Sequence, residues 1–98
     1  MKTLADLETQ AETVSKILKA ISHPKRLIIL CRLSEWPQTV GELERTCNIS
    51  QSQLSQFLTK MRDEWILGSE KSGLYITYRI SNPEMLQLLS SLSTIYCQ

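Results

Sequence analysis

Hydrophobic residues recur at steps of three and four along the first third of the chain, which is the spacing of an amphipathic helix. Over residues 4–21 these positions are Leu4, Leu7, Ala11, Val14, Ile17, Leu18 and Ile21. Pro24 interrupts the pattern, and proline is disfavoured inside a helix but favoured in a first turn. We therefore expect one helix over residues 4–21 and a second that begins at Pro24 and ends near Leu33.

Two capping sequences follow the loop at residues 34–38. Thr39 precedes Glu42 by three positions, the spacing of a capping box, and this predicts a helix over residues 40–47. Ser50 precedes Gln53 by the same interval and predicts a further helix over residues 51–64. Two capped helices joined by a turn of three or four residues are typical of a helix-turn-helix.

The helix expected over residues 51–64 has two different faces. Leu54, Phe57, Leu58 and Met61 follow the spacing of a buried stripe. Its remaining positions offer mainly amides and hydroxyls, at Gln51, Ser52, Gln53, Ser55, Gln56, Thr59 and Lys60. A plain solvated face would carry more Glu and Lys, whereas short hydrogen-bonding groups suit base edges and phosphate oxygens. We therefore favour a surface that contacts DNA over a plain solvated one.

The last third of the chain predicts a hairpin and a final helix. Residues 66–70 and 74–80 have the composition of strands, with Lys71, Ser72 and Gly73 between them. In the second strand Leu74, Ile76, Tyr78 and Ile80 alternate with polar or exposed positions, so this face is expected to pack. A helix is expected from Pro83 onward, and Glu84 is its only ionised residue, which favours an oligomer interface.

The elements together predict a mainly α (α+β) winged helix-turn-helix with four helices, a two-stranded β wing and a C-terminal helix. Residues 1–98 should form a single domain that dimerises through the first and last helices. Of the 98 residues, 42% are hydrophobic and 21% are charged, which is ordinary for a globular protein. The formal net charge is only +1, so any basic surface for nucleic acid must be local.

Other features narrow the class of protein. No apolar run approaches a membrane span and no secretory signal pattern opens the chain, so we expect a cytoplasmic protein without a membrane partner. Three widely spaced cysteines form no disulfide framework. The single histidine, His23, has no nucleophile and acid at a catalytic spacing, and the three glycines are scattered. We therefore expect neither an enzyme nor a cofactor, and His23 is interpreted as a cap or packing residue.

Three stretches of the sequence resemble ArsR/SmtB-type bacterial transcriptional repressors. They are S-H-P-K-R-L-I-I-L-C-R-L at residues 22–33, T-V-G-E-L at 39–43, and S-Q-S-Q-L-S-Q-F-L-T-K-M-R-D-E at 50–64. The pairing of I-L-C with a late Y-C is similar to the sulfur- and redox-responsive, BigR- and SqrR-like branch. Phe57 stands where the family often has His, and Trp65 where it often has Gly. These departures are expected to alter local DNA contacts and the angle of the wing.

The resemblance implies a homodimer that binds double-stranded operator DNA as a repressor. The residues expected to contact DNA are Gln51, Ser52, Gln53, Ser55, Gln56, Thr59, Lys60, Arg62 and Lys71. Among them, Gln53 and Gln56 are expected to pair with adenine. The resemblance also implies a redox switch formed by Cys31 and Cys97, with a reactive sulfur species or an oxidant as effector. Cys47 is interpreted as a packing residue.

Two alternatives remain open at the level of the sequence. The first is a metal-responsive repressor of the same family, which would have to gather Cys31, Cys47, Cys97 and His23 around one ion. The family's Cys-x-Cys metal site is missing, because Thr39 and Gly41 stand at those positions. We therefore expect no metal site. The second alternative is a winged-helix module that binds another protein.

Overall fold

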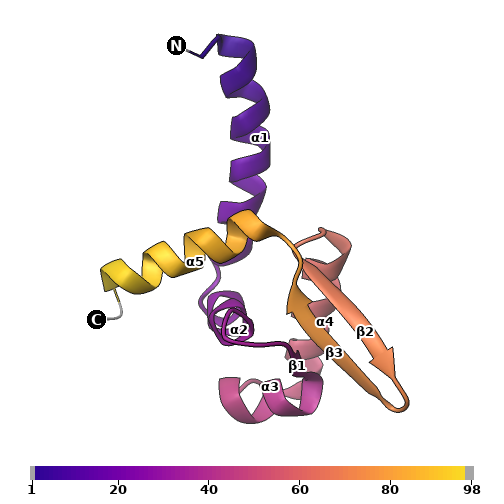
Figure 1. The fold of residues 1–98 in the computed structure, drawn as a ribbon. Coiled ribbons are helices and arrows are strands. Elements are labelled where there is room, and N and C mark those ends of the chain that lie inside the picture. The colour runs from indigo at the N-terminus through magenta and orange to yellow at the C-terminus, as the bar shows by residue number, and fades with distance from the viewer. Residues whose placement is uncertain (1, 97–98) are drawn as a thin grey trace.

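The computed structural model describes residues 2–96, which form five helices and three strands (Figure 1). In chain order they are α1 (Leu4–Ile21), α2 (Pro24–Leu33), β1 (Gln38–Thr39), α3 (Val40–Cys47), α4 (Gln51–Asp63), β2 (Leu67–Ser72), β3 (Tyr75–Ile80) and α5 (Pro83–Tyr96). The predicted winged helix-turn-helix is confirmed, with β1 as an additional short strand. Within residues 2–96, no helix combines the length and the apolar character needed to cross a membrane.

Side-chain caps determine where three of the helices begin. The hydroxyls of Thr3 and Thr39 each accept a hydrogen bond from the backbone three residues later, and Asp6 and Glu42 complete the two capping boxes. Ser50 caps α4 by accepting from the backbone of Gln53 at 3.3 Å. Because these bonds satisfy amides that a helix leaves unpaired, α3 and α4 start at positions that the sequence predicts.

The wing is a hairpin of β2 and β3, and β1 pairs with the other edge of β3. All pairings are antiparallel, and Ser72 lies opposite Tyr75 at the end of the hairpin. The turn therefore consists of residues 73 and 74, so the predicted loop at residues 71–73 is right for Gly73 and wrong for Lys71 and Ser72, which belong to β2. Gly73 has φ +61°, a conformation open to glycine, and it is the first residue of a turn that begins two residues later than composition suggested.

The hydrophobic core lies between α2, α3, α4, α5 and the base of the wing. Its fully buried large side chains are Ile29, Leu30, Leu43, Leu54, Leu58, Met61 and Met85. Tyr78 and Ile80 of β3 pack against this core, as predicted, but Leu74 and Ile76 are exposed. They are exposed because the hairpin extends beyond the body of the molecule, where no helix covers it (Figure 1).

Helix α1 projects from the rest of the molecule (Figure 1). Of its described side chains only Ile17 and Ala20 are buried, both near its C-terminal end. The exposed positions Leu4, Leu7, Ala11, Val14 and Leu18 are separated alternately by three and four residues, which is the heptad spacing of a helix that pairs with another helix.

Candidate nucleic-acid interface

Helix α4 separates a buried face from a polar exposed face. Leu54, Leu58 and Met61 are completely buried. Ser52, Ser55, Gln56 and Thr59 are exposed and follow the spacing i, i+3, i+4, i+7, so they form one continuous strip on the opposite side. The strip is uncharged and consists only of hydroxyl and amide groups. Such groups can donate and accept hydrogen bonds at the edges of bases.

The other predicted α4 residues lie on the flanks of this strip. Gln53 and Lys60 are seven residues apart and share one flank, while Gln51 and Arg62 lie on the other, nearer the core. All four side chains are exposed. The cations Lys60 and Arg62 both belong to the last turn of α4, where they also complement the helix dipole.

One contact on the flank differs from the sequence prediction. Gln53 was expected to complete a capping box with Ser50, but its Oε1 accepts a hydrogen bond from Nζ of Lys25 at 2.8 Å. Lys25 lies in the first turn of α2 and is 28 positions away in the sequence. No local pattern could have indicated this pairing, because it depends on how α2 crosses α4.

His23 holds the start of α2 against the same flank. Its Nδ1 accepts a hydrogen bond from the backbone N–H of Lys25 at 3.1 Å, which makes it the N-cap of α2. Its ring lies 5.0 Å from the ring of Phe57, at an angle of 53°. The interpretation of His23 as a cap or packing residue is therefore confirmed, and Phe57 is partly buried beneath it.

Trp65 terminates α4 in an unusual conformation for a tryptophan. Its φ is +64°, and its side chain is 84% exposed. Its N–H donates to the carbonyl of Arg62, and the N–H of Ile66 donates to the carbonyl of Met61, each at 3.0 Å. These two bonds form a Schellman motif, in which glycine is the usual residue at the left-handed position.

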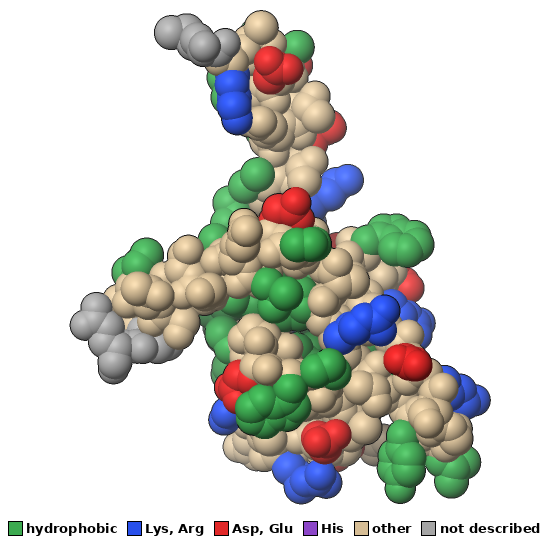
Figure 2. Space-filling model, in the orientation of Figure 1, with side chains coloured by type: hydrophobic (Ala, Val, Ile, Leu, Met, Phe, Trp, Pro, Cys, Tyr) green, Lys and Arg blue, Asp and Glu red, His purple; other side chains and the backbone are tan. Residues whose placement is uncertain are grey.

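The wing carries the last predicted DNA contact. Lys71 is exposed within β2, opposite Ile76, and not in the turn where the sequence suggested it. The tip itself is hydrophobic, since Leu74 and Tyr75 are 96% and 68% exposed. Figure 2 shows hydrophobic side chains at the far end of the hairpin, with Lys or Arg side chains near them.

The cysteines occupy different surroundings. Cys31 is exposed and lies in a hollow of about 520 Å³ between α2 and α5, whose other lining residues include Leu27, Leu92 and Tyr96. Cys47 is buried in the core, as predicted, and burial raises the pKa of its thiol. Cys97, the second predicted switch residue, lies outside the described residues.

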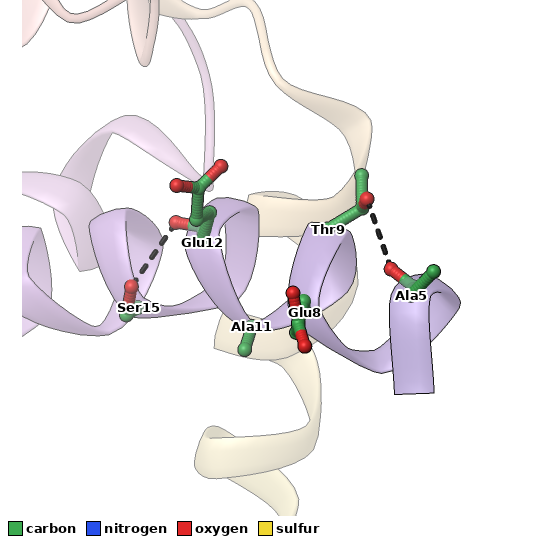
Figure 3. A pocket seen from close by; sticks show the side chains of 6 residues that line it. All are labelled: Ala5, Glu8, Thr9, Ala11, Glu12 and Ser15. Atoms are coloured by element: carbon green, nitrogen blue, oxygen red, sulfur yellow. Dashed lines mark hydrogen bonds between the residues drawn. The ribbon is translucent and has the colours of Figure 1, made fainter. Parts of the chain in front are cut away.

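Within residues 2–96, no three His, Cys, Asp or Glu side chains are placed to hold a metal ion together. Figure 3 shows a shallow hollow along α1, lined by Glu8, Glu12 and small side chains. There the hydroxyls of Thr9 and Ser15 donate to backbone carbonyls of the same helix, at 3.1 and 3.0 Å.

Comparison with known proteins identifies the family to which this chain belongs. Residues 23–64, which contain α2, α3 and α4, match the family described as "Bacterial regulatory protein, arsR family". The chain is 44% identical over 98 residues to the HTH-type transcriptional regulator YgaV of Escherichia coli K12, covering 99% of each chain. It is 39% identical over 95 residues to the biofilm growth-associated repressor of Xylella fastidiosa (strain Temecula1), covering 97% of this chain and 83% of the relative.

The fold agrees with these sequence matches. The crystal structure of the transcriptional repressor BigR from Xylella fastidiosa superposes with a TM-score of 0.89 at 38% identity and covers 99% of each chain. These relatives are regulators of transcription and not enzymes, which confirms the prediction that this chain is not an enzyme. The chain belongs to the arsR family of bacterial regulatory proteins.

Proposed function

We propose that the protein is a dimeric repressor of transcription that binds operator DNA through the exposed face of α4. We further propose that it releases the operator when Cys31 and Cys97 are oxidised or persulfidated. The relatives named as repressors support the first part of this proposal, and the surroundings of Cys31 support the second.

The observation that carries the proposal is the uncharged strip of Ser52, Ser55, Gln56 and Thr59. An α-helix fits the major groove, where each base pair presents a different set of donors and acceptors. The amide of Gln56 can donate to N7 and accept from N6 of adenine, while the hydroxyls contact base edges or phosphates. The strip has no Leu, Met or aromatic anchor of the kind that protein-binding faces use.

Cations beside the strip supply the contacts with the phosphate backbone. Lys60 and Arg62 of α4 and Lys71 of β2 are exposed. Neutralising one phosphate releases condensed counterions, so each contact should steepen the dependence of log K on log salt concentration by about one unit. These residues orient the protein on the duplex, whereas the strip selects the sequence.

The dimer is proposed from hydrophobic side chains that the described chain leaves uncovered. Leu4, Leu7, Val14 and Leu18 are between 48% and 72% exposed on one face of α1. Leu86 and Ile95 of α5 are exposed as well. A symmetric dimer that buries these faces would present two copies of α4 to half-sites about one helical turn apart.

The switch is proposed from the hollow between α2 and α5. Cys31 and Tyr96 line it together, and Cys97 follows Tyr96 directly in the sequence. A sulfane-sulfur oxidant such as hydrogen disulfide would convert the two thiols to a disulfide, taking two electrons and two protons and leaving as two molecules of H₂S. Cys47 takes no part, because its buried thiol with a raised pKa is a poor nucleophile.

The covalent bond would act on DNA binding through the dimer. Joining the end of α5 to α2 would shift the helices that we propose form the interface, and would move the two copies of α4 away from one-turn spacing. A change of about 3 kcal/mol in binding free energy corresponds to roughly 100-fold in affinity. A shift of that size would suffice to release an operator.

Selection of bound fragments from the genome of the host tests the DNA-binding part. The reduced protein should enrich a few sites with inverted half-sites about 10 base pairs apart, centre to centre. Recovery of fragments without a common sequence would contradict the proposal and would favour a module that binds protein.

A titration of the selected duplex tests the switch. Polysulfide treatment should weaken binding by the wild type and by Cys47→Ala, but not by Cys31→Ser or Cys97→Ser. The switch is wrong if both serine variants still respond, or if the treated wild type binds as tightly as the reduced protein.

A further inference from the structure

A side chain from the first turn of α2 contacts α4, the helix that we propose binds DNA. Nζ of Lys25 donates to Oε1 of Gln53 at 2.8 Å, and Lys25 is partly buried although it is charged. Its backbone is fixed by the hydrogen bond to His23, whose ring packs on Phe57 one turn along α4 from Gln53. Two contacts therefore hold the start of α2 to the flank of α4 that carries Gln53.

The contact changes what Gln53 can offer to a ligand. A glutamine amide has one oxygen that accepts and one nitrogen with two donor hydrogens, and a free side chain can rotate to present either. A hydrogen bond from an ammonium group is stronger than one between neutral groups. Lys25 therefore holds the oxygen toward α2 and leaves the Nε2 hydrogens facing away from it.

We propose that Lys25 is a positioning residue that sets the base preference of Gln53, an inference that rests on the proposed binding of DNA by α4. Pairing with adenine requires Gln53 to accept from N6 and to donate to N7 at the same time. Because Lys25 occupies one lone pair of Oε1 and turns this oxygen toward α2, the Nε2 donors are the groups that Gln53 presents to a base. Donors match the N7 and O6 acceptors of guanine, so the pair Lys25–Gln53 should favour guanine where Gln53 alone would favour adenine.

Selection from a library of random duplexes, followed by sequencing, tests this inference. The proteins compared are the wild type, Lys25→Met, Gln53→Ala and the double variant. Methionine keeps most of the length of the side chain and removes the donor. Lys60→Met is the matched control, since Lys60 lies on the same flank of α4 but forms no hydrogen bond with Gln53.

We expect Lys25→Met to change the preferred base from guanine to adenine at the position where Gln53→Ala loses its preference. The change in discrimination should lie between about 5- and 150-fold, the range of a good bidentate base contact. The double variant should resemble Gln53→Ala, because Lys25 acts through Gln53. Lys60→Met should weaken binding to all sequences alike and reduce the salt dependence.

Two results would overturn the inference. If Lys25→Met weakened binding uniformly, as Lys60→Met is expected to do, Lys25 would be a phosphate contact. If Gln53→Ala changed the preference at no position, Gln53 would not contact a base. Failure of the proposed function gives a different result, since the wild type itself would then enrich no sequence. Circular dichroism and the unfolding temperature of each variant confirm that it is folded.

Discussion

Trp65 adopts a left-handed backbone conformation, which the end of α4 requires and which tryptophan rarely takes. A side chain with a Cβ atom pays about 1 to 2 kcal/mol in the left-handed region, and glycine avoids that cost but loses more entropy on folding. The exposed indole of Trp65 gains little from burial. We therefore expect Trp65→Gly to raise the free energy of unfolding by about 0.5 to 1 kcal/mol, measured by urea unfolding.

Trp65→Ala is the control for this prediction. Alanine removes the indole but keeps the Cβ atom that causes the strain at φ +64°. It should therefore leave the free energy of unfolding close to that of the wild type. An equal gain from alanine and glycine would assign the effect to loss of the indole and would contradict the account.

At the scale of the element, the start of α3 couples stability to pH. The backbone N–H and the hydroxyl of Thr39 both donate to Oε1 of Glu42 at 3.0 Å, and these bonds lower the pKa of Glu42. A carboxyl whose pKa is lower in the folded state stabilises the fold above its unfolded pKa. That contribution is lost as pH falls from about 4.3 through the lower folded pKa.

We therefore expect the wild type to be more stable than Glu42→Gln at pH 7, because only the carboxylate carries the charge that these hydrogen bonds favour. The difference should shrink as the pH approaches 3. Urea unfolding of both proteins at pH 7, 5 and 3 measures it. A difference that stays constant over this range would show that Glu42 contributes no pH-dependent stability.

The elements that the sequence predicts well are those with local signals. The Thr39 and Ser50 caps place the starts of α3 and α4, because a cap depends on residues three positions apart. Strand β1 has only two residues and forms through pairing with β3, some 38 positions later, so no local pattern indicates it. The hairpin turn was misplaced because Lys71 and Ser72 have the composition of a loop yet pair across the wing.

The candidate DNA-binding site likewise has features that the sequence predicts and features that it does not. Helical periodicity separates the exposed strip of α4 from Leu54, Leu58 and Met61, so the exposed face could be predicted. The partner of Gln53 could not, since Lys25 approaches it from another helix. Likewise, no local pattern indicates that Cys31 and Tyr96 share one hollow, because that depends on the packing of α5 against α2. Only the family resemblance pairs Cys31 with Cys97, the residue after Tyr96.

At the scale of the whole molecule, the projecting α1 should have a partner. Leu7→Asp places a charge in the heptad stripe, where a dimer would bury it without a counter-ion. We expect this variant to sediment as a monomer at micromolar concentration, whereas the wild type should sediment as a dimer. It should also bind the selected duplex more weakly, because one copy of α4 then contacts only one half-site.

Leu74→Asp is the matched control, because Leu74 is an exposed leucine at the tip of the wing, far from α1 in the fold (Figure 1). This variant should remain a dimer. A monomeric wild type, or a Leu7→Asp protein that stays dimeric, would contradict the proposed interface.

We propose above all that the exposed strip of α4, which contains Gln56, selects the DNA sequence. The most direct measurement compares the affinity of the reduced wild type and Gln56→Ala for the selected duplex and for random DNA. Gln87→Ala, at an exposed position of α5, serves as the control. We expect Gln56→Ala to cost about 1 to 3 kcal/mol on the selected duplex and little on random DNA, with no effect of Gln87→Ala. Equal losses on both duplexes would contradict the claim, because Gln56 would then contribute to DNA binding without contacting a base.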